Sequence, residues 1–273
     1  RSTGEVYKGK VETKAAEVSG DFAALMDLCN KYTKLNVRTN ADTPHDAEVA
    51  RAFGASGIGL CRTEHMFFDA EKIVAMREMI LSPDVEGRRK ALAKLLPYQK
   101  ADFKGIFKAM DGCPVNVRLL DPPLHEFVPH DAKGQEEMAK AMGVTVQEIK
   151  KRVESLCEHN PMLGHRGCRL GNTYPEITEM QTQAILGAAI ELKKEGYDPH
   201  PEIMVPLTGI LYEFEAQEKV IRDAAAALFE KEGMEIPFKV GTMIEIPRAA
   251  LTANRIASRA EYFSFGTNEI GRA

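Results

Sequence analysis

The chain has 273 residues, of which 44% are hydrophobic and 28% charged, with a formal net charge of -4. That balance is ordinary for a soluble protein, gives no basic footprint for nucleic acid, and includes no apolar run long enough to cross a membrane. Its five cysteines are scattered without a CxxC pair, which indicates a reducing compartment. We expect the cytoplasm, with an organelle as the alternative location of a longer parent chain.

Short apolar runs alternate with segments of helical period along the chain, which predicts an α/β fold with a parallel sheet. Residues 1–20 are expected to form a linker and residues 22–32 a modest amphipathic helix. The expected strands are 35–39, 58–61, 115–120, 202–207, 240–244 and 262–265. Helices are expected between them, including 70–110, 175–194 and 213–232.

One connection, residues 124–159, is too long for a simple loop. Within it, Thr145 and Glu148 have the spacing of a capping box, and apolar residues at helical spacing follow. We therefore predict a helical insertion, placed over the end of the sheet where the strands terminate. His125 and His130 lie in this segment, and we assign them no role, because single histidines in such places are usually solvated or locally bonded.

Two arginines stand at the ends of neighbouring predicted strands. Arg62 follows the second strand, and Arg118 lies in the third, which Asp121 and two prolines terminate. The carboxyl ends of parallel strands are where ligands bind, and a guanidinium can hold two oxygens of one phosphate or carboxylate. The alternative is structural, with Arg62 paired to Glu64 or His65. Asp121 is expected to be a buried partner that holds an arginine.

Carboxylates follow the last two predicted strands in the same way. Glu245 comes after the fifth strand and Glu269 after the sixth, one repeat further along the chain. Two carboxylates at matching strand ends are suited to a hard cation, which prefers oxygen ligands. The alternative is that Glu245 pairs with Arg248 and that Glu269 binds nothing.

Five separated motifs carry a resemblance to a known family. They are GTMIEIPRAAL (241–251), FSFGTN (263–268), GIGLCRTEHMFF (57–68), VRLLDPPLHEF (117–127) and NPMLGHRGCRL (160–170). The chain resembles the phosphoenolpyruvate-binding domain of the PEP-utilising enzymes over nearly its whole length, and within that family it fits the pyruvate phosphate dikinase group. The resemblance implies a TIM-type (β/α) barrel over 21–273, with about six of its eight strands encoded, and makes 1–20 a remnant of the linker from a phosphohistidine domain.

The resemblance also implies an activity. Enzymes of this group interconvert ATP, phosphate and pyruvate with AMP, pyrophosphate and phosphoenolpyruvate, and this domain transfers a phosphoryl group between phosphohistidine and pyruvate enolate. Implied catalytic residues are Arg62, Arg118 and Arg166; implied substrate-binding residues are Arg62, Arg118, Glu245, Gly266, Thr267 and Asn268; the implied Mg²⁺ ligands are Glu245 and Glu269. Arg169 is expected to be structural.

The chain departs from the family pattern in two respects. Glu269 stands where the family has aspartate, and none of the cysteines lies in the loop that provides the proton for the enolate carbon. We therefore expect the chain alone to be inactive. Its expected partners are pyruvate or phosphoenolpyruvate, the phosphohistidine domain of the parent chain and a second copy in a homodimer, without nucleic acid or membrane. The alternatives are the barrel of PEP synthase or of phosphotransferase-system Enzyme I, or a ligand-binding fragment without catalysis.

Overall fold

A computed structural model describes residues 4, 8–9, 18–68, 70–121, 123–157, 160 and 163–266. Its centre is one six-stranded sheet in the order β1-β2-β3-β4-β5-β6, in which every neighbouring pair is parallel. The strands are β1 (Thr39–Asn40), β2 (Ile58–Arg62), β3 (Pro114–Arg118), β4 (His200–Val205), β5 (Lys239–Ile244) and β6 (Phe263–Phe265). Sequential parallel order is the topology of a (β/α) barrel, so the predicted fold class is confirmed as a curled, incomplete barrel.

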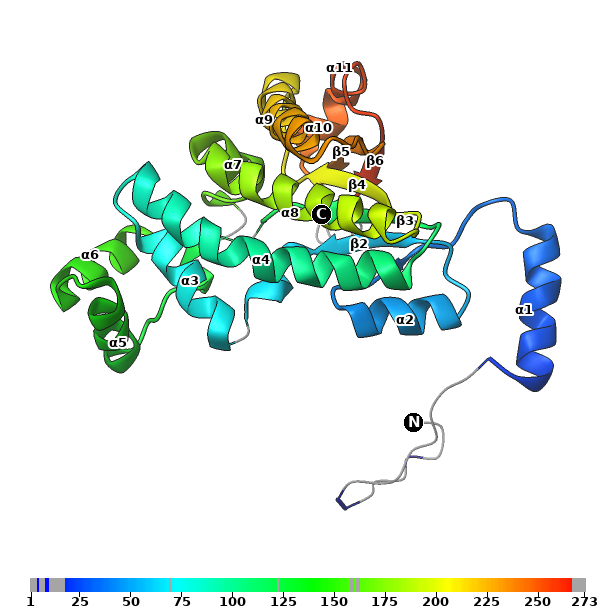
Figure 1. Cartoon of the computed structure of the whole chain (residues 1–273), viewed down its shortest axis with the longest axis horizontal. Helices are drawn as coiled ribbons and strands as arrows, with labels where there is room; N and C mark the ends of the chain where they lie inside the picture. Colours follow the sequence, from blue (N-terminus) through cyan, green and yellow to red (C-terminus); the bar gives the residue numbers. More distant parts are fainter. Residues whose placement is uncertain are drawn as a thin grey trace.

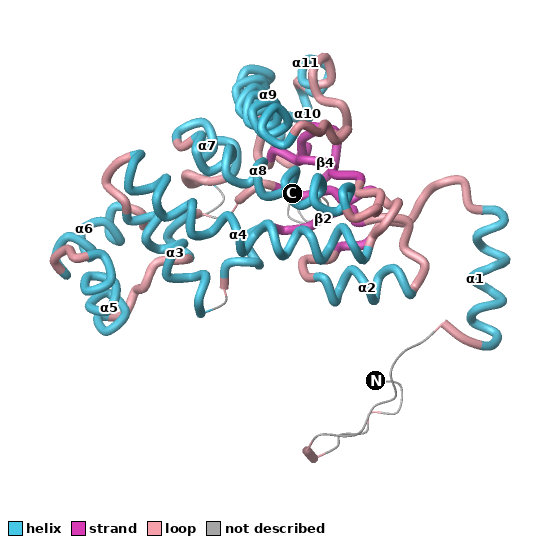
Figure 2. The backbone as a smooth tube through the Cα atoms, in the orientation of Figure 1, coloured by secondary structure: helices cyan, strands magenta, loops and turns pink. Residues whose placement is uncertain are grey.

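Helices surround this sheet, and Figure 2 shows the strands gathered within them. The α-helices are α1 (Gly20–Tyr32), α2 (Pro44–Ala52), α3 (Ala70–Leu81), α4 (Val85–Ala109), α5 (Ala132–Met142), α6 (Val146–Ser155), α7 (Gly167–Thr173), α8 (Pro175–Lys194), α9 (Leu211–Glu232), α10 (Pro247–Leu251) and α11 (Ala253–Ile256). Two 3-10 turns follow strands β2 and β3: η1 (Thr63–Phe67) comes after β2, and η2 (Leu124–Glu126) comes after β3. The long helices α4 and α8 run side by side along the sheet (Figure 1).

The core forms where α4 and α8 pack on the strands. Phe103, Ile106, Phe107 and Met110 recur at helical spacing on α4 and are all buried, as the sequence predicts. Strand residues such as Val117 are buried in the same cluster. This packing fixes the helices against the sheet, so the loops at the carboxyl ends of the strands are held by a rigid scaffold.

The amino-terminal strand is much shorter than predicted. We expected residues 35–39, but β1 has two residues, and Leu35 and Val37 are 82% and 70% exposed. Thr39 pairs with Ile58, the first residue of β2, so the residues before Thr39 have no β2 residue to pair with. The predicted amphipathic helix does form as α1, but none of its residues is buried and it lies apart from the sheet (Figure 1).

The predicted helical insertion also forms, as α5 and α6. The Thr145–Glu148 capping box is present at the start of α6, and Ile149 and Val153 are buried, as predicted. However, α5 and α6 pack on each other and α5 on α3, at the opposite end of the molecule from α1 (Figure 1). That the insertion lies over the barrel mouth stays a prediction; its apolar faces pack in a second core cluster beside α3.

Substitution of Gly241 by alanine should destabilise the sheet. A Cβ atom there would lie 2.5 Å from the backbone oxygen of Tyr262 and 2.6 Å from its ring, and neither can retreat without moving β6. We expect a loss of roughly 1–3 kcal/mol in the free energy of unfolding, measured by urea denaturation. Gly187→Ala is the matched control: its Cβ would meet the flexible end of Lys100 at 3.3 Å, and alanine favours helix, so stability should hold or rise. Equal losses in both variants would contradict the prediction.

Candidate active site at the carboxyl ends of the strands

A cavity of about 540 Å³ opens where the strands end. Its walls include residues that follow β2, β3, β5 and β6, and α7 adds a further side. The residues around it are Asn40, Leu60, Arg62, Arg118, Asp121, Leu163, Arg166, Arg169, Leu207, Met243, Glu245, Ile246, Pro247, Phe265 and Gly266. The structure therefore brings together Arg62, Arg118, Arg166, Glu245 and Gly266, while Thr267, Asn268 and Glu269 lie outside the described residues.

Arg62 and Arg118 are direct neighbours in the sheet, because they pair in the register of β2 with β3. Asp42, just past β1, orients Arg62: its carboxylate accepts from the Arg62 backbone N–H at 2.7 Å and from Nη1 at 3.3 Å. The same carboxylate contacts His65 Nδ1 at 2.7 Å. Asp42, to which sequence reasoning gave no role, thus takes the place of Glu64 and His65, the partners we considered for Arg62.

Asp121 joins the other two arginines. Its Oδ2 accepts from Arg118 Nη1 at 3.1 Å and from Arg166 Nη2 at 2.8 Å, and its side chain is only 2% exposed. The prediction that Asp121 is a buried arginine partner is confirmed. Burial alone would lower the pKa of Arg118, but the charges of Glu64 and Asp121 outweigh it and raise that pKa. Arg118 therefore stays charged although it is largely buried.

The α7 side of the site depends on close backbone packing. Arg166 precedes α7, and a Cβ at the next residue, Gly167, would lie 2.9 Å from Leu207. Gly167 also has φ +55°, a conformation in which glycine is favoured. Leu207 itself has φ 58°, which is uncommon outside glycine and recurs at functional sites. Arg169 Nη1 donates to the Gly164 carbonyl at 2.9 Å, in line with a structural role, although it also faces the cavity.

Glu245 is a half-buried acid with one defined hydrogen bond. Its Oε1 accepts from the backbone N–H of Leu207 at 2.7 Å, in place of the pairing with Arg248 that we considered. Burial raises the pKa of the Glu245 carboxyl, and Asp121 adds to this, while the Leu207 N–H and the arginines act against it. Among the described residues no three acid, histidine or cysteine side chains gather around a metal position. Of the two predicted metal ligands, Glu245 lines the cavity and Glu269 lies outside the described residues, so the metal site stays a prediction.

The cysteines do not add a proton donor to this cavity. All five are described, and none lies in its wall. Burial raises the pKa of Cys61 well above its ordinary value and that of Cys168 to about 12, so both thiols stay protonated.

Across the part of the chain that the structure describes, no helix has the length and apolar character needed to span a bilayer.

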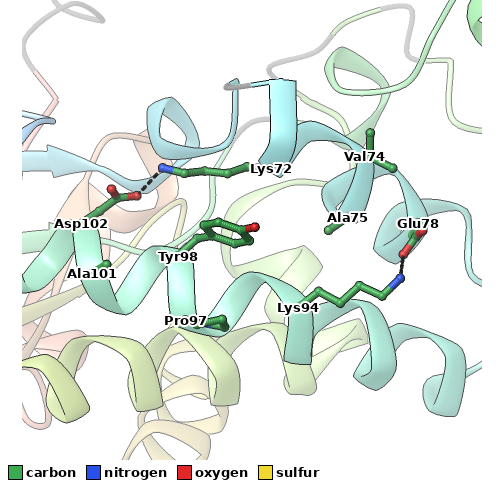
Figure 3. Close-up of a pocket in the computed structure, with 9 residues that line it drawn as sticks. All are labelled: Lys72, Val74, Ala75, Glu78, Lys94, Pro97, Tyr98, Ala101 and Asp102. Atoms are coloured by element: carbon green, nitrogen blue, oxygen red, sulfur yellow. Dashed lines mark hydrogen bonds and ion pairs between the residues drawn. The ribbon is translucent and has the colours of Figure 1, made fainter.

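A larger cavity of about 750 Å³ lies between α3 and α4 (Figure 3). Ion pairs cross it, from Lys72 Nζ to Asp102 at 2.7 Å and from Lys94 Nζ to Glu78 at 2.5 Å, and its floor is mainly apolar. Its charges pair across the opening and do not converge on one point. The strand-end cavity is therefore the better candidate for chemistry, despite its smaller volume.

Comparison with known proteins gives the family of the chain. The family model described as PEP-utilising enzyme, PEP-binding domain, matches residues 16–272. Pyruvate, phosphate dikinase from Clostridium symbiosum is 55% identical over 270 residues, which is 98% of this chain and 31% of that protein. The Giardia intestinalis enzyme is 55% identical over 269 residues, which is 98% of this chain and 30% of that protein. A chloroplastic enzyme of Oryza sativa is 54% identical over 272 residues, which is 98% of this chain and 29% of that protein. This chain spans under a third of those relatives, and it belongs to the family of PEP-utilising enzymes as their PEP-binding domain.

Proposed function

We propose that this chain binds phosphoenolpyruvate and pyruvate in a phosphotransferase of the pyruvate, phosphate dikinase type. The observation that carries the proposal is the convergence of Arg62, Arg118 and Arg166 on one strand-end cavity, each held by a buried or half-buried carboxylate. The relatives named above are all dikinases, which supports this reaction over those of PEP synthase and Enzyme I.

The residue types fit phosphoryl transfer. Its transition state is loose, and its charge is spread over the phosphoryl oxygens, so fixed cations stabilise it. Arg62 and Arg118 stand side by side in the sheet, and Arg166 faces the same cavity from the start of α7. They bind and orient the phosphoryl group, while Gly266, Thr267 and Asn268 orient the organic part of the substrate. The phosphoryl donor is a phosphohistidine on another domain of the parent chain, so the 273-residue chain should bind ligand without turnover.

The charges around the cavity leave room for a cation. Four arginines, Arg62, Arg118, Arg166 and Arg169, are matched by the carboxylates of Asp42, Glu64, Asp121 and Glu245, so their formal charges cancel. An anionic ligand then needs additional positive charge. A half-buried carboxylate with a raised pKa, such as Glu245, is a suitable oxygen ligand for Mg²⁺, with the residue at position 269 as the second. When bound, Mg²⁺ supplies Lewis-acid stabilisation of the enolate.

Two further parts of the proposal concern the whole protein. Among the described residues β1 and β6 are the edge strands of the sheet; such edges favour association with further chain, and we propose a homodimer. The reducing compartment indicated by the unpaired cysteines is the cytoplasm, or an organelle, since some relatives carry the name chloroplastic.

Calorimetric titration of the chain with oxalate, a mimic of pyruvate enolate, tests the proposal. We expect saturable binding in the presence of Mg²⁺ and its loss when EDTA is added, because oxalate needs the cation to offset the surrounding carboxylates. Equal binding with and without Mg²⁺ would refute the metal, and an absence of binding to oxalate and phosphoenolpyruvate under both conditions would refute the function.

A further inference from the structure

Glu64 is a buried acid that the proposed mechanism does not use. It lies in η1, two residues after Arg62, and its side chain is 7% exposed. Its Oε1 accepts a hydrogen bond of 2.5 Å from Nη2 of Arg118. The sequence suggested it only as a structural partner of Arg62, whereas the structure places it on the arginine of the neighbouring strand.

The neighbourhood of Glu64 is poorly suited to stability. Its second oxygen, Oε2, is buried without a hydrogen-bond partner, and the same is true of Thr63 Oγ1 and Arg118 Nε. A buried polar atom without a partner costs about 1–3 kcal/mol, and buried ion pairs are often no more stable than apolar packing of the same volume. Three such atoms around one ion pair are expected where function, and not stability, determines the residues.

Glu64 and Asp121 hold Arg118 from two sides. Glu64 accepts a hydrogen bond from Arg118 Nη2, while Asp121 forms an ion pair with Arg118 Nη1 at 3.1 Å. Asp121 divides its Oδ2 between Arg118 and Arg166, so its position is a compromise between two guanidinium groups. The hydrogen bond of Glu64 is to Arg118. With Asp121 on one terminal nitrogen, Glu64 on the other limits the rotation of the Arg118 guanidinium, and Arg118 lines the cavity.

We propose that Glu64 is a positioning residue that sets the Arg118 guanidinium for the phosphoryl group of phosphoenolpyruvate. This inference rests on the proposed function, and it predicts a selective effect. Oxalate has no phosphoryl group, so its binding does not need an oriented Arg118, whereas phosphoenolpyruvate does. Loss of the Glu64 charge replaces an ion pair with a hydrogen bond to a neutral carbonyl, which holds the arginine less firmly.

Glu64→Gln tests this, since it keeps the shape of the side chain and removes its charge. In titrations with Mg²⁺, we expect the affinity for phosphoenolpyruvate to fall about tenfold, which corresponds to the loss of one oriented contact between Arg118 and the phosphoryl group. The affinity for oxalate should stay within about twofold of the parent value. Glu78→Gln, at the Lys94 ion pair between α3 and α4, is the matched control and should change neither. A merely structural role of Glu64 would weaken the binding of both ligands to the same degree, which would overturn the proposal.

A double-mutant cycle shows whether Glu64 acts through Arg118. In an Arg118→Met background, adding Glu64→Gln should leave the phosphoenolpyruvate affinity unchanged, because the group to be positioned is gone. An additional tenfold loss would overturn the positioning role. If the parent chain binds both ligands and Glu64→Gln matches it, the Glu64 proposal alone is wrong; if the parent binds neither, the proposed function fails and the role of Glu64 fails with it.

Discussion

Replacement of Glu245 by glutamine should abolish Mg²⁺-dependent binding of oxalate. Glutamine keeps the size of the side chain and can still accept from the Leu207 N–H, but it offers Mg²⁺ a neutral carbonyl in place of a carboxylate. With four arginines around the cavity, loss of this charge also raises the repulsion of a cation. We expect at least a hundredfold loss of apparent affinity, which is about 2.7 kcal/mol, by calorimetric titration at fixed Mg²⁺.

Two further variants make that test specific. Glu230→Gln removes an exposed acid of α9 and should leave oxalate binding unchanged. Glu269→Asp restores the residue of the family motif and should strengthen binding or leave it as it is. If Glu245→Gln binds oxalate as tightly as the parent chain, the metal is not bound at Glu245.

Replacement of Asp121 by asparagine should have the largest effect on stability. The carboxylate is buried beside Arg118 and Arg166, and asparagine leaves both guanidinium groups without their shared counter-charge. Breaking a buried pair by removing one partner typically costs about 3–5 kcal/mol. We expect that loss in the free energy of unfolding from urea denaturation, together with a loss of phosphoenolpyruvate affinity, because two of the three arginines lose their orientation.

The control for Asp121 is Asp223→Asn on α9. Asp223 pairs with Lys219 one helical turn away, and both side chains are mostly exposed, so water replaces the lost contact and stability should barely change. If Asp121→Asn unfolds at the same urea concentration as the parent chain, other groups hold Arg118 and Arg166.

Much of the site could be read from residues that follow apolar strands. Arg62, Arg118 and Glu245 each stand at a strand end, and parallel strands present those ends at one edge, so their convergence follows from local pattern and topology. The pairing of Arg62 with Asp42 and of Arg118 with Glu64 could not be read in this way. The members of these pairs are 20 and 54 residues apart, and which acid reaches which arginine depends on register and side-chain direction.

The sequence by itself determined the alternation of strands and helices, the apolar face of α4 and the capping box of α6, because period, helix start signals and turn residues act over a few residues. Only the tertiary structure decided the short β1, the place of α5 and α6 beside α3, and the carboxylates that hold the arginines. Each of these depends on which surfaces meet after folding. The pattern of an apolar face predicts that the face will be buried but not which element will cover it. A buried charge pairs with whichever opposite charge the packing brings within reach.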